Sequence, residues 1–166
     1  MIEYQSEERY VIMENCMVRL ARMEDYESVE NIMKQVQNLH IEWRPDIYKP
    51  CDVVLSYEEF LEAIGTETLL VADLEDKVVG ILLFLYRHVG SDKQVKRDVL
   101  FIEAMAVDES HRGKGVGHKL FDEVKKIAKQ KKVDRIELQV NARNIRAKAM
   151  YESYGFTEKS INMELL

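Results

Sequence analysis

The chain has 166 residues and a mass of 19.5 kDa, enough for one domain that buries a core without disulfides or a metal. Its 46% hydrophobic and 33% charged residues are typical of a globular protein in water, and 7 Gly and 2 Pro exclude a collagen-like or low-complexity chain. The longest apolar run, residues 78–86, falls short of the roughly 20 residues that cross a bilayer, and the first ten residues are too polar for a secretory signal. The two cysteines form no CxxC pair and indicate no disulfide framework. We therefore expect one cytoplasmic domain over residues 1–166, with residues 1–14 left as a candidate N-terminal extension.

The charge distribution bears on binding partners. The formal net charge of −6 argues against nonspecific binding to nucleic acid or to an anionic membrane. Residues 1–30 hold eight acids and three bases, whereas residues 111–132 hold eight bases and two acids. Such a chain suits a cationic substrate and an anionic cofactor held in different places, although two solvated faces would give the same pattern.

Six segments have the composition of strands. Alternating or continuous apolar residues predict strands over residues 17–22, 68–73, 77–87, 98–107, 133–140 and 157–165. Residues 74–76 form a short predicted turn between the second and third strands. Residues 90–97 are predicted as a polar connector before the fourth.

Four segments have apolar residues at helical spacing. They predict helices over residues 24–39, 56–65, 116–128 and 144–154. Residues 41–52 contain both prolines and the single tryptophan, so an irregular segment is expected there. A strand, helix and strand between residues 99 and 140 require a parallel pair joined by a right-handed crossover, while the earlier strands favour antiparallel neighbours. The sequence thus predicts an α/β fold with a mixed sheet flanked by helices.

The most informative segment follows the fourth predicted strand. Arg112-Gly-Lys-Gly-Val-Gly-His118 comes after a short loop and opens a predicted helix. The N-terminus of a helix has unpaired amides and a partial positive charge, and glycines let a bulky anion approach the backbone. The segment therefore predicts a phosphate or pyrophosphate site, unless the turn serves the fold alone.

Two familiar phosphate-binding motifs do not fit this segment. A P-loop places Lys-Ser or Lys-Thr after its last glycine, whereas His118-Lys119 follows Gly117 here. A dinucleotide-binding turn has the spacing GxGxxG, whereas Gly113, Gly115 and Gly117 give GxGxG. Both an NTPase and a dinucleotide-binding fold are disfavoured.

The motif and its surroundings resemble the GNAT superfamily of acyl-CoA-dependent N-acetyltransferases. The family signature [QR]-x-x-G-x-[GA] is matched by Arg112, Gly115 and Gly117. A second family pattern, Asn followed seven residues later by Tyr and then Gly-Phe, is matched by Asn144, Tyr151 and Gly155-Phe156. The resemblance is clear over residues 98–156, and Arg19 and Ala21 ahead of Asp25 resemble the usual opening.

The resemblance implies a location for acetyl-CoA, the cosubstrate of the family. The sheet would splay open between its fourth and fifth strands, and the backbone of Met105, Ala106 and Val107 would pair with the pantetheine arm. Asn144 would contact the pantetheine end or would only cap its helix. The pyrophosphate would be held by the backbone of the turn, namely Arg112, Gly113, Lys114, Gly115, Val116, Gly117 and His118.

The resemblance also implies an acetyl transfer to a primary amine by direct attack in a ternary complex. A backbone amide near Met105 would stabilise the oxyanion, and Tyr151 would protonate the departing thiolate unless it only packs its helix on the sheet. Glu103, in an otherwise apolar strand and at the same alternation as Met105, would accept the amine proton. It could instead bind the substrate ammonium or pair with a lysine. Trp43 and Tyr48, beside His40, would line the acceptor pocket or belong to the core.

Several features stay open. The four histidines have no metal-ligand spacing, so no metal is expected. The acceptor is expected to be a small-molecule or peptide amine, cationic in character, and a homodimer is left open. The main alternative is a non-catalytic module of the same fold that senses acyl-CoA. Another is an acyltransferase that uses a different acyl-CoA or a hydroxyl acceptor.

Overall fold

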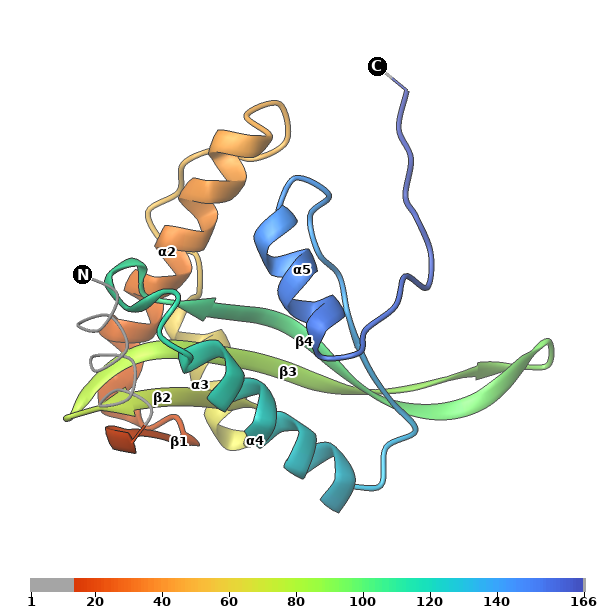
Figure 1. Ribbon diagram of the computed structural model, residues 1–166, viewed down its shortest axis with the longest axis horizontal. Helices are drawn as coiled ribbons and strands as arrows, with labels where there is room; N and C mark the ends of the chain where they lie inside the picture. Colours follow the sequence, from red (N-terminus) through yellow and green to blue (C-terminus); the bar gives the residue numbers. More distant parts are fainter. Residues whose placement is uncertain (1–13, 166) are drawn as a thin grey trace.

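The computed structural model describes residues 14–165. The candidate N-terminal extension, residues 1–14, lies outside the described residues except for Glu14. The described chain forms five strands, two short 3-10 turns and four α-helices (Figure 1). The strands are β1 (Cys16–Leu20), β2 (Leu69–Leu74), β3 (Lys77–Ser91), β4 (Gln94–Val107) and β5 (Arg135–Leu138). The helical elements are η1 (Met23–Asp25), α2 (Tyr26–Trp43), α3 (Tyr57–Gly65), η2 (Glu109–His111), α4 (Val116–Gln130) and α5 (Ile145–Ser153).

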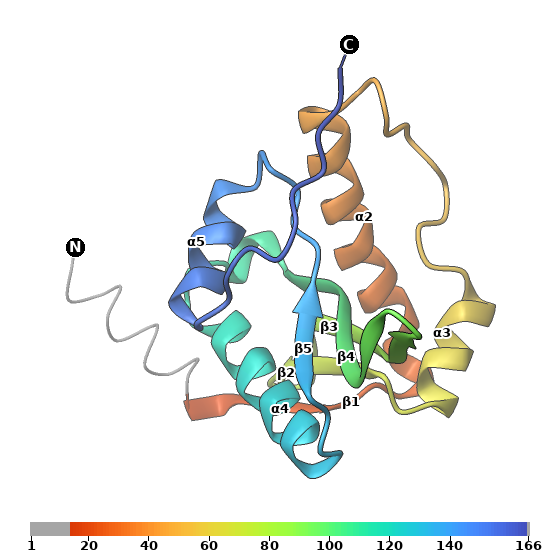
Figure 2. The same ribbon diagram turned by 90° about the vertical axis from the view of Figure 1, so that its right-hand side faces the viewer.

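The five strands form one mixed sheet in the order β1-β2-β3-β4-β5. The first four are antiparallel neighbours, and β5 pairs with β4 in parallel. Figure 2 shows α2 and α3 on one side of the sheet and α4 and α5 on the other. The predicted α/β fold with a mixed, helix-flanked sheet is therefore confirmed.

Each face of the sheet has its own core. Toward α2 and α3, residues such as Val29 and Phe60 pack on Val71 and Ile81, all fully buried. Toward α4, residues such as Leu120 and Val124 pack on Leu82 and Leu100. Burying apolar surface on both faces holds the helices on the sheet and fixes where the ends of β4 and α4 meet.

The polar connector predicted over residues 90–97 is wrong, because β3 and β4 continue through most of it as a long hairpin. Within it Ser91 pairs with Gln94, and just before it polar cross-strand contacts hold the two strands together: His88 Nδ1 lies 2.7 Å from Asp98 Oδ1, and the Arg87 guanidinium lies 3.5 Å above the Phe101 ring. Backbone pairing needs no apolar side chains, so the polar composition was misleading.

Two further boundaries differ from the predictions. The irregular segment begins later than expected, since α2 continues through Trp43 and ends before Arg44, which precedes Pro45 and so disfavours helical geometry. The predicted strand over residues 157–165 is absent from the described structure. In Figure 1 this segment leaves the end of α5 and runs past it to the C-terminus, apart from the sheet.

A β-bulge interrupts β4 close to its end. Leu83 pairs with Ala104 and Phe84 pairs with Ile102, so Glu103 has no partner on β3. The extra residue changes the alternation of side chains. Met105 therefore packs toward α4, on the same face as Ile102, and the predicted alternation that grouped Glu103 with Met105 is wrong.

Candidate functional site

The edge of β4 that faces β5 becomes free partway along the strand. Residues Val99–Ile102 pair with Arg135–Leu138, and from Glu103 onward β4 has no partner on this side among the described residues. The two strands thus separate where the bulge lies. The ladder ends at the position expected for a sheet that splays between its fourth and fifth strands.

The register shows which backbone groups face this open edge. The Asp108 amide donates to the Val79 carbonyl at 2.9 Å, on the β3 side. Because amides alternate in direction along an antiparallel strand, the Ala106 amide also faces β3, and those of Met105 and Val107 face the open edge. The open edge therefore offers backbone donors to an extended polar chain.

In the turn between β4 and α4, glycines occupy positions whose backbone angles would strain any other residue. Gly113 has φ +79° and Gly115, the N-cap of α4, has φ +92°. Glycine adopts such angles without the steric penalty that a Cβ brings. No side chain caps α4, whereas Ser56 caps α3 by accepting from the Glu59 amide at 3.2 Å. The first-turn amides of α4, which include those of Val116 and Gly117, consequently point out of the helix end without a side-chain acceptor, a geometry that suits an anion.

Arg112 and Gln35 hold this turn against β4 and α2. The Arg112 Nε donates to the Val107 carbonyl at 2.9 Å. Gln35 Nε2 donates to Asp108 Oδ2 at 2.8 Å, and Gln35 Oε1 accepts from the Glu109 amide at 3.0 Å and from Arg112 Nη2 at 3.3 Å. Nothing in the sequence singled out Gln35, which lies more than 70 residues from its partners. A polar residue in the middle of a helix was the only available signal.

The loop ahead of the turn is ordered by Asp108. Its carboxylate accepts from the Ser110 hydroxyl and the Ser110 amide, and lies 3.1 Å from His111 Nδ1. The hydrogen bond from the Ser110 hydroxyl, assisted by Gln35, holds the pKa of Asp108 well below its usual value. The carboxylate therefore stays charged at neutral pH and can accept these hydrogen bonds.

Three elements of the site meet at Gly117. A Cβ there would lie 3.3 Å from Met105 Cε and 3.6 Å from Met150 Sδ, so the end of β4, the start of α4 and the middle of α5 are in close contact. The His118 ring meets the Tyr154 ring edge-on at 4.9 Å. The structure thus brings the two halves of the predicted motif together, although they are about 30 residues apart.

Asn144 is the N-cap of α5. Its Oδ1 accepts from the Ala147 amide at 3.1 Å. Of the two roles expected for this residue, the cap is the one that the structure contains. A contact with the pantetheine end stays a prediction.

Tyr151 is 9% exposed and belongs to the middle of α5. Its ring meets the Phe156 ring edge-on at 5.7 Å, so it does contribute to packing. Burial raises the pKa of Tyr151 to about 12, and the phenol therefore carries its proton at neutral pH.

Tyr154, one turn further on, gives a prediction about stability. Its ring stacks on Phe121 at 4.2 Å, but its hydroxyl is buried and bonds to no other group among residues 14–165. A buried hydroxyl without a partner lowers stability, so Tyr154→Phe is expected to raise the free energy of unfolding by about 1 kcal/mol. Chemical denaturation would measure this, and a lower midpoint for the variant would contradict it.

Glu103 is exposed, although it stands in an otherwise apolar strand. The bulge releases its side chain from the packed alternation of β4. Glu103 therefore lies at the start of the open edge and in contact with solvent. This position suits a group that exchanges protons with water.

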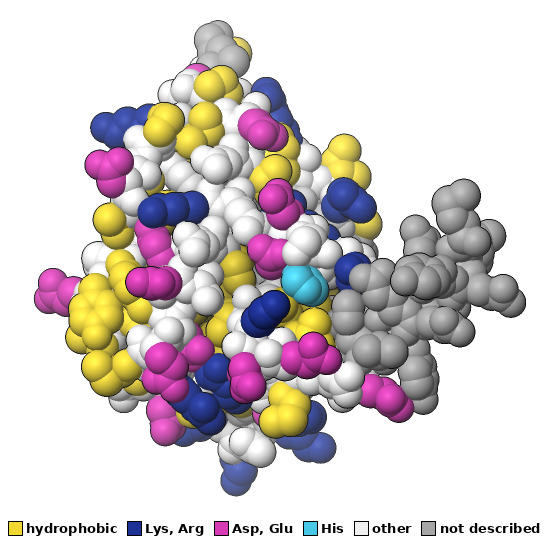
Figure 3. Space-filling view, turned by 90° about the vertical axis from the view of Figure 1, so that its left-hand side faces the viewer, with side chains coloured by type: hydrophobic (Ala, Val, Ile, Leu, Met, Phe, Trp, Pro, Cys, Tyr) yellow, Lys and Arg dark blue, Asp and Glu magenta, His cyan; other side chains and the backbone are white. Residues whose placement is uncertain are grey.

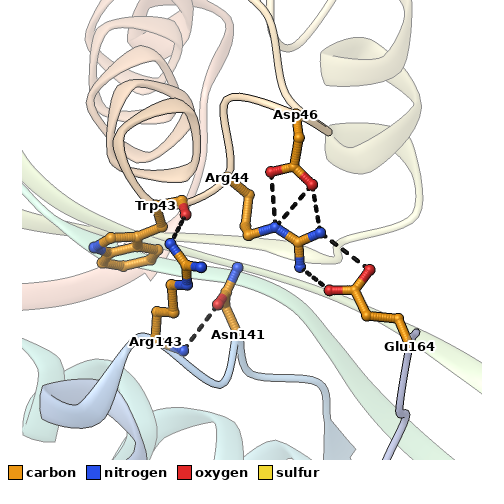
Figure 4. Close-up of polar contacts among 6 residues, drawn as sticks. All are labelled: Trp43, Arg44, Asp46, Asn141, Arg143 and Glu164. Atoms are coloured by element: carbon orange, nitrogen blue, oxygen red, sulfur yellow. Dashed lines mark hydrogen bonds and ion pairs between the residues drawn. The ribbon is translucent and has the colours of Figure 1, made fainter. Parts of the chain in front are cut away.

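The segment expected to border an acceptor pocket forms an aromatic cluster. The His40 ring lies 4.8 Å from the Tyr48 ring and 5.8 Å from the Trp43 ring. Burial lowers the pKa of His40, so it is neutral at pH 7. Arg143, which precedes α5, donates to the Trp43 carbonyl (Figure 4). This contact connects the aromatic cluster to the loop that carries Asn144.

Part of the acidic stretch over residues 1–30 serves the fold. Asp25 is 5% exposed and pairs with Arg19 at 2.7 Å, and Glu30 is 6% exposed and accepts from the Val54 and Leu55 amides. Figure 3 shows Asp and Glu side chains interspersed with Lys and Arg over one face of the molecule. That face therefore carries charges of both signs, with no large patch of one sign.

Residues 14–165 hold neither a metal-binding cluster nor a candidate membrane span. These residues contain no group of three or more His, Cys, Asp or Glu side chains placed to hold a metal ion. They also contain no helix with the length and apolarity needed to cross a bilayer.

The fold and the site define a class: a mixed α/β domain in which an open strand edge adjoins a glycine-rich helix N-terminus. Comparison with known proteins gives the family. Residues 33–156 match the family model for the acetyltransferase (GNAT) family. The chain belongs to this family, which confirms the resemblance.

Similar proteins agree with this assignment. A solved structure of a mutant BH1408 protein from Bacillus halodurans superposes with a TM-score of 0.83 at 31% identity, covering 90% of this chain and 98% of that one. Mycothiol acetyltransferase from Beutenbergia cavernae is 36% identical over 63 residues, 38% of this chain and 21% of that protein. Streptothricin acetyltransferase from Escherichia coli is 36% identical over 66 residues, 40% of this chain and 38% of that protein. The matched segments thus span well under half the length of either named enzyme.

Proposed function

We propose that the protein is an acetyl-CoA-dependent N-acetyltransferase that acts on a cationic primary amine by direct attack in a ternary complex. The observation that supports this best is the uncapped N-terminus of α4, which Arg112 holds directly beside the open edge of β4. Coenzyme A contains a diphosphate and an amide-bearing arm. A helix N-terminus suits the first and an open strand edge suits the second.

The chain's own residues fit this cosubstrate. The amides from Arg112 to His118 would hold the pyrophosphate, with Arg112 and Lys114 adding positive charge. The backbone of Met105 and Val107 would pair with the pantetheine arm, and Asn144 would add a contact beyond its cap. When bound, acetyl-CoA supplies an activated acetyl group.

Two groups would act on the thioester, and a third, Glu103, on the incoming amine. The Met105 amide faces the open edge and would stabilise the developing oxyanion, because it has no ladder partner to satisfy it there. Tyr151 would donate its proton to the departing thiolate, and its raised pKa keeps that proton available.

Glu103 would accept the proton from the incoming ammonium, directly or through water, because its exposed carboxylate lies where β4 leaves β5. In Glu103→Gln only the free amine can react, and its fraction falls tenfold for each pH unit below the amine pKa. The loss of activity is therefore expected to grow as the pH falls. Rates of acetylation from pH 6 to pH 9 would measure it, with Glu109→Gln, an exposed glutamate on the neighbouring loop, as the control. Parallel pH profiles for Glu103→Gln and the wild type would remove the base role.

Two observations support a cationic amine as the acceptor: the negative net charge of the chain and the names of two relatives. The chain carries a net charge of −6, and two relatives are named for mycothiol and for streptothricin. A panel of polyamines, aminoglycosides, lysine peptides and peptide N-termini, assayed for thiol release from acetyl-CoA, tests the proposal. Release with at least one amine supports it. Binding of acetyl-CoA without release for any amine would instead support a sensor module, and preference for another acyl-CoA would correct the donor.

A further inference from the structure

The side chain of Gln35 connects two helical layers of the molecule. Gln35 lies in the middle of α2, where Ile32 is buried in the core on that face of the sheet and Val36 packs against the same core. The turn that leads from β4 into α4 lies beside α2 at the end of the sheet, and α4 itself covers the opposite face (Figure 1, Figure 2). Gln35 therefore reaches the turn from a backbone position that the core holds in place.

The carboxamide of Gln35 bonds through both of its polar atoms. Its Nε2 donates to Asp108 Oδ2 at 2.8 Å. Its Oε1 accepts from the Glu109 amide at 3.0 Å and from Arg112 Nη2 at 3.3 Å. A carboxylate needs a donor, whereas a backbone amide and a guanidinium need an acceptor, so a side chain that ends in one donor and one acceptor satisfies all three groups. A carboxylate or an apolar side chain at this position would leave at least one of them unsatisfied.

The two charged residues at the start of the turn are joined through Gln35. The second Asp108 oxygen, Oδ1, accepts from the Ser110 amide and hydroxyl. The Nε of Arg112 donates to the Val107 carbonyl at 2.9 Å. Asp108 and Arg112 thus each use one group on a neighbour in sequence and another on Gln35. The part of the turn directly ahead of its glycines is therefore tied both to itself and to α2.

This attachment matters for anion binding because the turn is rich in glycine. Gly113 and Gly115 have positive φ, and glycine loses more conformational freedom than any other residue when its backbone becomes fixed. A turn that moved freely would lose that freedom each time its amides closed on a diphosphate, and the entropic cost would weaken binding. A turn that is already held at its first residues avoids part of this cost.

We propose that Gln35 is a positioning residue, which holds the turn before α4 in the conformation that binds the diphosphate of coenzyme A. This inference rests on the proposed function, since it takes coenzyme A as the ligand of the turn. Gln35 acts through Asp108, Glu109 and Arg112. Its loss is therefore expected to weaken binding of the diphosphate part and to leave the chemical step, to which the open edge of β4 and Tyr151 contribute, almost unchanged.

Exchanging the donor and the acceptor of this contact tests the proposal by binding alone. Gln35→Glu places a second carboxylate against Asp108, and is expected to raise the Kd for coenzyme A about tenfold or more in calorimetric titration. Adding Asp108→Asn supplies a donor from the other side. Its new amide can donate to the carboxylate at position 35 while its oxygen still accepts from Ser110. The double variant keeps the net charge of the wild type, and its Kd is expected to return close to the wild-type value.

A second pair of variants tests whether the effect is confined to the diphosphate. Gln35→Leu is expected to raise the KM for acetyl-CoA about tenfold or more with kcat almost unchanged. For acetyl-pantetheine, a thioester without the diphosphate, kcat/KM should stay at the wild-type value. The matched control is Gln37→Leu, the same change on the same helix, at a side chain that donates to the Lys49 carbonyl at 3.0 Å. This control should leave the kinetics with both thioesters unchanged.

The outcomes separate this inference from the proposed function. A wild type that does not bind coenzyme A would overturn both. If the wild type binds, an unchanged Kd for Gln35→Glu, a double variant as weak as Gln35→Glu, or an unchanged KM for Gln35→Leu would each overturn the role of Gln35 and leave the proposed function standing. Equal losses with acetyl-CoA and acetyl-pantetheine would show a general disturbance of the fold, and would also overturn that role.

Discussion

Replacing Tyr151 with phenylalanine is expected to lower turnover at least tenfold and to leave the affinity for acetyl-CoA almost unchanged. The substitution removes only the hydroxyl, so the ring keeps its edge-on contact with Phe156. A general acid contributes roughly a hundredfold or more when it protonates a leaving group, and a bulk water that replaces it recovers part of that. Steady-state rates of thiol release and calorimetric titration with acetyl-CoA would measure the two effects separately.

Tyr154→Phe is the matched control for this experiment. It removes a hydroxyl at the C-cap of the same helix, one turn away, where that group has no role in the proposed chemistry, and turnover should be retained. The pKa of Tyr151, raised to about 12, also predicts that deprotonation of this phenol causes no loss of activity at neutral or mildly alkaline pH. Equal turnover for Tyr151→Phe and the wild type would show that Tyr151 only packs its helix.

Replacing Gly115 with valine is expected to weaken acetyl-CoA binding at least tenfold. Gly115 has φ +92°, a conformation that a β-branched residue avoids at a cost of about 1–2 kcal/mol or more. The backbone would relax by turning the first amides of α4 away from the direction in which they would hold a pyrophosphate. Calorimetric titration with coenzyme A would measure the change in Kd.

Gly65→Ala provides the control for Gly115→Val. Gly65 is the last residue of α3, and a Cβ there would meet nothing within 4 Å. This variant should bind coenzyme A like the wild type. If Gly115→Val also binds with an unchanged Kd and folds normally, the turn before α4 is not the diphosphate site.

The two variants probe separate parts of the site. Gly115→Val acts on binding, because it changes the backbone that would hold the cosubstrate. Tyr151→Phe acts on the chemical step, because it removes a proton donor and leaves the backbone intact. A loss of both properties in either variant would point to a general disturbance around Gly117, where the two elements meet.

The parts of the site that sequence could predict are those whose pattern is local. The glycines at positions 113 and 115 take positive φ within a turn of a few residues, and Asn144 caps the helix that directly follows it. Glu103 shows the limit of such reasoning. Alternation along β4 wrongly predicted that Glu103 and Met105 share a face of the sheet. The bulge that separates them depends on the register between β3 and β4, and packing on both faces of the sheet sets that register.

The sequence by itself determined the family, the order of helices and strands as far as α5 and the glycine-rich turn before α4, because these depend on neighbouring residues and on hydrophobic spacing. Only the tertiary structure decided which distant groups meet. Gln35 reaches the turn from α2, Arg143 reaches Trp43 across about 100 residues, and Met105 and Met150 meet at Gly117. Residues 157–165 are the clearest case. Their alternation predicts a strand, yet a strand forms only where another strand accepts its hydrogen bonds, and pairing is a property of the folded chain and its partners.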